Sequence, residues 1–78
     1  MTIEDRVKKI IARVLKIEVE QIKNKASLRD DLGADSINLA ELVLSMEDEF
    51  HIEEIPEEDQ SKLVTVQNII DYLTEKQQ

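Results

Sequence analysis

The chain has 78 residues, no cysteine and a formal net charge of −8, so we expect one small domain over residues 1–78, without disulfides or thiolate metal sites. Residues 30–61 contain 12 acidic side chains and no lysine or arginine, whereas residues 1–29 contain 8 basic and 4 acidic ones. This acidic middle excludes nucleic acid as the expected partner, because phosphate binding needs basic residues, and favours basic protein surfaces. No apolar run approaches the roughly 20 residues that span a bilayer, and the acidic N-terminus is unlike a signal peptide. We therefore predict a cytoplasmic protein that is not embedded in a membrane.

Apolar residues at helical spacing predict a first helix over about residues 3–15, with Thr2 as its N-cap. The periodicity weakens over residues 16–35, where we expect a long connection with at most one helical turn, around residues 18–22. Scattered apolar residues are the expected anchors of this connection: Ile17, Val19, Ile22, Ala26, Leu28 and Leu32.

A second helix is predicted over about residues 36–50, after the only glycine and with Asp35 as N-cap. Pro56 is expected at the first position of a short helix that ends near Ser61. A last helix follows over about residues 66–75, with Thr65 as N-cap. The fold class is therefore all-α, with three main helices and one short one.

The second predicted helix has two apolar stripes. The wider one is an ordinary core stripe: Leu39, Leu42, Val43, Met46 and Phe50. The narrower stripe lies on another face, and acidic residues flank it. It consists of Ile37, Ala40 and Leu44, with Glu41, Glu47 and Asp48 around it. An apolar centre with a charged rim is typical of a protein interaction surface, although the short helix or the long connection could also cover it.

Ser36 begins this helix, at the edge between the two stripes. The only histidine, His51, lies near the far end of the same helix, roughly 20 Å away at 1.5 Å per residue. Because no base can reach Ser36, the sequence predicts no catalytic site, and any reaction at this hydroxyl needs a base from another protein. We expect His51 to face solvent.

The run Asp31-Leu32-Gly33-Ala34-Asp35-Ser36-Ile37 resembles the Asp-Leu-Gly-Ala-Asp-Ser-Leu signature of acyl carrier proteins. Further similar segments lie in the family's order at residues 2–11, 41–43, 47–50, 55–56, 65–67 and 70–72, so the resemblance extends over the whole chain. It implies a four-helix bundle, a monomer and a protein that is not an enzyme, as in bacterial type II fatty-acid synthesis.

The resemblance also implies that Ser36 carries 4′-phosphopantetheine, which a separate holo-acyl-carrier-protein synthase transfers covalently from coenzyme A. The thiol of this arm would hold growing fatty acyl chains as thioesters, and each chain would fold back into the bundle. Gly33 and Asp35 would shape the attachment site. Fatty-acid synthesis enzymes and acyltransferases with basic patches would dock on the second helix. Their docking residues would be Ile37, Ala40, Glu41, Leu44, Glu47 and Asp48.

The sequence departs from the family pattern at a few positions. Ile37 replaces leucine, Asn38 replaces a common aspartate, and Leu39 replaces a common threonine, which would reshape the acyl pocket. The connector over residues 51–55 is one residue longer. The loss of a charge at Asn38 would weaken holo-synthase recognition or a weak divalent-cation site at Asp30 and Asp35; no specific metal site is predicted.

Two alternatives stay open. The cargo could belong to a specialised pathway, as a polyketide, aminoacyl or other acyl group. The chain could instead be an unmodified acidic helical adaptor that binds basic proteins through its second helix.

Overall fold

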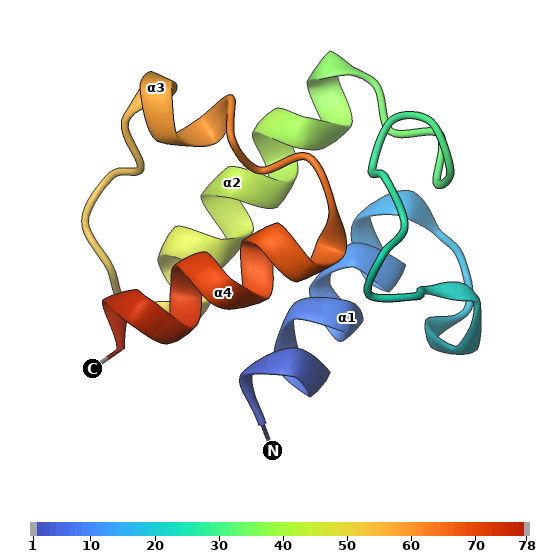
Figure 1. Cartoon of the computed structure of the whole chain (residues 1–78), viewed down its shortest axis with the longest axis horizontal. Helices are drawn as coiled ribbons and strands as arrows, with labels where there is room; N and C mark the ends of the chain where they lie inside the picture. The colour runs from blue at the N-terminus through green and yellow to red at the C-terminus, as the bar shows by residue number, and fades with distance from the viewer. Residues whose placement is uncertain (1, 78) are drawn as a thin grey trace.

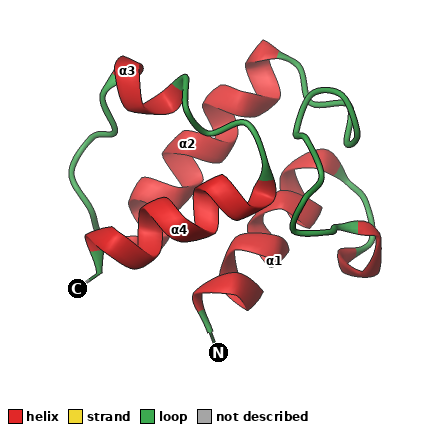
Figure 2. Cartoon of the chain, viewed as in Figure 1, coloured by secondary structure: helices red, strands yellow, loops and turns green. Residues whose placement is uncertain are grey.

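The structure is a computed structural model, and it describes residues 2–77. Four α-helices and one short 3₁₀ helix follow in chain order: α1 (Ile3–Leu15), η1 (Val19–Gln21), α2 (Ser36–Phe50), α3 (Glu57–Gln60) and α4 (Val66–Lys76). The described part contains no strand (Figure 2). The prediction of an all-α bundle with three main helices and one short one is confirmed, and η1 is the helical turn expected near residues 18–22.

Among the three long helices, α1 contacts both α2 and α4 (Figure 1). Aliphatic side chains fill the space between them, and Phe50 is the one buried aromatic residue in the part of the chain that the structure describes. The buried residues are Val7, Ile10, Ile11, Ile22, Leu28, Ala34, Leu42, Met46, Phe50, Ile55, Val66, Ile69, Ile70 and Leu73. No helix in residues 2–77 is long and apolar enough to cross a membrane.

Local capping sets the helix ends that the sequence predicted. The Thr2 hydroxyl accepts a hydrogen bond from the Asp5 N–H at 3.1 Å, so Thr2 is the N-cap of α1. Thr65 caps α4 in the same way, through the Asn68 N–H at 3.1 Å. One prediction is wrong by a residue: Pro56 is the N-cap of α3 rather than its first helical residue, because its ψ of 150° is extended.

The connection between α1 and α2 is held by backbone pairing that the sequence did not reveal. The Leu28 N–H donates to the Val64 carbonyl at 2.9 Å, and the Val66 N–H donates to the Ala26 carbonyl at 3.1 Å. The segment before α4 therefore fastens the middle of this connection. Of the predicted anchors, Ile22 and Leu28 are buried, but Val19 is 39% exposed, so the prediction that it anchors the connection is wrong.

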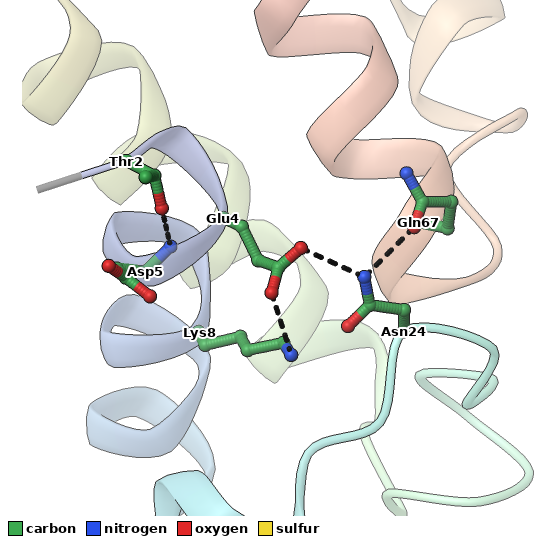
Figure 3. Close-up of polar contacts among 6 residues, drawn as sticks. All are labelled: Thr2, Glu4, Asp5, Lys8, Asn24 and Gln67. Carbon is green, nitrogen blue, oxygen red and sulfur yellow. Dashed lines mark hydrogen bonds and ion pairs between the residues drawn. The ribbon is translucent and has the colours of Figure 1, made fainter.

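A polar network joins α1, the connection and α4 (Figure 3). The Asn24 side-chain amide donates to Glu4 Oε1 at 3.1 Å and to Gln67 Oε1 at 3.0 Å, while Lys8 Nζ lies 3.4 Å from Glu4 Oε2. The hydrogen bond from Asn24, followed by that from Lys8 and its positive charge, lowers the pKa of the Glu4 carboxyl. These contacts hold the connection that leads to Ser36.

Candidate attachment site and docking surface

Ser36 is the first residue of α2, and its side chain is exposed. Asp35 is the N-cap: its Oδ1 accepts from the Asn38 N–H at 2.8 Å, and Asn38 Oδ1 accepts from the Asp35 N–H at 3.2 Å. This reciprocal pair is a capping box. Asn38 thus accepts a hydrogen bond at the start of the helix through its side-chain oxygen, although it lacks the negative charge of the aspartate common at this position. Gly33 has a φ of +75°, a left-handed conformation that glycine adopts without strain.

A cavity of about 300 Å³ extends inward from Ser36, between α2 and the segment that joins α3 to α4. Most of its wall is apolar, and side chains from four parts of the chain contribute. The lining residues are Leu28, Arg29, Ser36, Leu39, Ala40, Leu42, Val43, Met46, Gln60, Ser61, Leu63 and Ile69. A cavity of this volume lies at the lower end of the roughly 300–1,000 Å³ range of ligand pockets. The serine therefore stands at the mouth of a space that an apolar chain could enter.

The sequence had placed Leu39 at this pocket but missed most of the other walls. Arg29, Gln60, Ser61 and Leu63 come from segments without helical periodicity, so no local pattern placed them beside α2. The one sequence signal at Arg29 is its position, because it is the last basic residue before the acidic segment.

No side chain in residues 2–77 forms a hydrogen bond with the Ser36 hydroxyl. His51 lies at the opposite end of α2, about 22 Å away over a 15-residue helix. It is exposed and takes the left-handed conformation, with a φ of 52°, as the C-cap of the helix. The prediction that His51 faces solvent is confirmed. The arrangement makes Ser36 an accessible hydroxyl group to which no side chain of residues 2–77 forms a hydrogen bond.

The narrow stripe of α2 is uncovered. Ile37 is 71% exposed and Leu44 is 66% exposed, and Ala40 between them is also exposed. Neither α3 nor the long connection buries them, so the possibility that the fold covers this stripe is excluded for the described residues. Glu41 and Asp48 are exposed at its sides. The face combines an apolar centre with an acidic rim.

Glu47, the third acidic residue of this rim, has a contact that the sequence did not predict. Its Oε2 accepts a hydrogen bond from the Ile55 N–H at 2.7 Å, and the side chain is half-buried. Ile55 itself is only 2% exposed. Glu47 therefore fastens the connector between α2 and α3, in addition to any part it takes in docking.

The acidic residues near Ser36 are dispersed. Residues 2–77 contain no group of three or more histidine, cysteine, aspartate or glutamate side chains that could hold a metal ion. Asp31 accepts a hydrogen bond from the Ser27 N–H at 2.7 Å, and Asp35 caps α2, so both carboxylates have structural contacts. The weak cation site at Asp30 and Asp35 stays a prediction.

Comparison with known families defines the class of protein. The family described as "Phosphopantetheine attachment site" matches residues 5–73, which is most of the chain. The chain belongs to this family, whose members carry 4′-phosphopantetheine as a covalently attached group. Domains of this family are generally carriers rather than catalysts, and they act with enzymes that modify them and handle their acyl groups.

Proposed function

We propose that this chain is an acyl carrier protein of fatty-acid synthesis, that residues 1–78 form its single domain, and that Ser36 bears the arm. One observation carries the proposal: the exposed Ser36 hydroxyl stands at the mouth of the mainly apolar cavity. An attached arm could present its thioester outside the protein, while the acyl chain enters the bundle. Gly33 and Asp35 support this role by setting the turn and the cap that expose the serine.

The attachment reaction needs a second protein. The Ser36 oxygen would attack the phosphorus atom of coenzyme A that bears the pantetheine, the bond to the nucleotide half would break, and a phosphodiester would remain. Since no described side chain forms a hydrogen bond with the Ser36 hydroxyl, the holo-acyl-carrier-protein synthase would accept its proton. The proposed site of these reactions is the cytoplasm, with the carrier as a monomer.

The cavity suits a short or medium acyl chain in its present dimensions. Half-buried Leu39 and Val43 line it together with buried Leu42 and Met46. Burial there would shield the chain from water and stabilise the loaded protein, because apolar surface leaves the solvent. A longer chain would require α2 and the α3–α4 segment to move apart.

The exposed stripe of α2 is the proposed docking surface for fatty-acid synthesis enzymes and acyltransferases. Ile37, Ala40 and Leu44 would contact the partner, while Glu41 and Asp48 would meet its basic residues. Replacing Glu41 with lysine should weaken partner binding and reduce its salt dependence with the fold unchanged, because the Glu41 side chain is exposed. Binding that does not change would contradict the docking assignment.

Mass spectrometry of the intact protein tests the attachment site. The chain is incubated with coenzyme A and a promiscuous phosphopantetheinyl transferase, beside S36A and the control S61A. Ser61 is a suitable control because it lines the same cavity. We expect the wild type and S61A to gain one phosphopantetheine and S36A to gain none. No gain by folded, initially unmodified wild type would refute the proposal and favour the acidic adaptor.

A further inference from the structure

The cavity at Ser36 has an unexpected charge. Arg29 is the only charged residue in its lining, although the protein has a net charge of −8 and residues 30–61 contain no lysine or arginine. A second hollow, next to the first, shares Leu28, Leu39 and Leu63 with it and is also lined by Arg29. One guanidinium group therefore stands beside both hollows.

The backbone brings Arg29 close to the attachment site. The Ala34 N–H donates to the Leu28 carbonyl at 2.8 Å, which closes the loop over residues 28–34. Arg29 follows one end of this hydrogen bond, and Asp35 and Ser36 follow the other. Residue 29 is thus a spatial neighbour of the α2 N-terminus, although it lies seven positions before the serine.

The guanidinium group is available for a ligand. Arg29 is exposed, and among residues 2–77 no hydrogen bond or ion pair engages its side chain. Asp30, the next residue in sequence, lines only the second hollow and forms no ion pair with Arg29. Asp31 accepts a hydrogen bond from the Ser27 N–H. By contrast, Arg6 is paired with Glu49 at 3.0 Å.

We propose that Arg29 is an anion-binding residue of the attachment site, and that its ligand is the phosphodiester which the arm forms on Ser36. The inference rests on the proposed function. A phosphodiester carries one negative charge, and on Ser36 it would lie beside the Asp35 carboxylate in an acidic region. Arginine suits this ligand because its planar fork of N–H donors matches phosphate oxygens. Arg29 would offset the added repulsion and hold the base of the arm toward the cavity.

The test compares apo and fully loaded protein in the wild type, R29M, R29K and K62M. R29M keeps an apolar stem without the charge, and R29K keeps the charge. K62M removes an exposed cation that follows Ser61 in sequence but does not line the cavity. Loading is verified by intact mass before each measurement, so a protein that accepts no arm counts against the proposed function and not against this inference.

We expect loading to lower the melting temperature of R29M by roughly 2–5 °C more than that of the wild type, as one exposed ion pair predicts for a domain of this size. The extra loss should shrink at 1 M salt, where charges are screened beyond about 3 Å. The ³¹P resonance of the phosphodiester should shift in R29M and stay near its wild-type position in R29K and K62M.

If loading changes the melting temperatures of R29M and the wild type equally, and if their ³¹P positions are equal, the proposal is overturned. A malonyl arm and an acetyl arm are compared as well, since malonyl ends in a carboxylate. A coupling to Arg29 that appears only with malonyl would show that the cargo carboxylate is the ligand, and the phosphodiester assignment would fail. Should R29M not fold, the change of the wild-type ³¹P position between low salt and 1 M salt still decides, because a phosphodiester bound by Arg29 must respond to the screening of that charge, and an unchanged position would overturn the proposal.

Discussion

Replacement of Glu47 by alanine should destabilise the protein far more than replacement of the other acidic residues on the same helix. The Glu47 carboxylate accepts from the Ile55 N–H at 2.7 Å, and Ile55 is 2% exposed. Without that carboxylate, a backbone donor beside a buried side chain loses its partner. Hydrogen bonds to charged groups contribute about 1.5–3 kcal/mol, so we expect E47A to lose about 2 kcal/mol of unfolding free energy.

This loss is large enough to measure. For a domain of 60–100 residues, 1 kcal/mol corresponds to roughly 4–8 °C, so the melting temperature of E47A should fall by roughly 8–16 °C. E47Q keeps an oxygen acceptor and should lose less. Glu41 and Asp48 are exposed and form no hydrogen bond or ion pair in the described residues, so E41A and D48A should stay within about 0.5 kcal/mol of the wild type.

Urea denaturation followed by far-ultraviolet circular dichroism gives these free energies. If E47A unfolds at the same urea concentration as E41A, the contact with Ile55 does not stabilise the connector, and Glu47 is only another acidic residue of the rim. The measurement also separates two effects in docking experiments, because a Glu47 variant that binds partners poorly could have lost its connector rather than a surface charge.

Three further predictions concern contacts around the site. Burial and the hydrogen bond to Asp59 raise the pKa of Tyr72 to about 12, so its contribution to stability is complete below pH 10 and is lost as the pH rises to 12. The free energy of unfolding measured in urea should therefore fall more steeply from pH 10 to 12 in the wild type than in Y72F, and parallel plots of this free energy against pH would refute the assignment. G33A should lose about 1–2 kcal/mol of unfolding free energy, because alanine is strained at a φ of +75°. The cost is conformational only, since no neighbouring atom would contact the added Cβ, and G33N should lose less because asparagine tolerates this conformation better. Equal stability of G33A and the wild type in urea would contradict this. N24A should raise the pKa of Glu4 toward its ordinary value, which carboxyl NMR titration measures, and an unchanged pKa would exclude the hydrogen bond from Asn24 as its cause.

The sequence determined by itself those features that depend on neighbours three or four positions apart. The bounds of α1 and α2 were predicted to the residue, and Thr2, Asp35 and Thr65 were identified as caps. A cap is a hydrogen bond between a side chain and a backbone N–H within one turn, and an amphipathic stripe repeats with the helix.

Only the tertiary structure decided what surrounds that serine. Arg29 and Leu63 line the same cavity, and Glu47 holds the Ile55 N–H, because chain segments far apart in the sequence or without periodicity pack together. The pairing of Leu28 with Val64 joins segments 36 positions apart, and no spacing in the sequence encodes such a contact. A helix end is set by hydrogen bonds within one turn, which only a few backbone conformations allow. The position of a loop depends instead on which apolar side chains from distant segments are buried together. The exposed apolar stripe of α2, our proposed docking surface, was therefore readable in the sequence, and the charge beside the proposed attachment site was not.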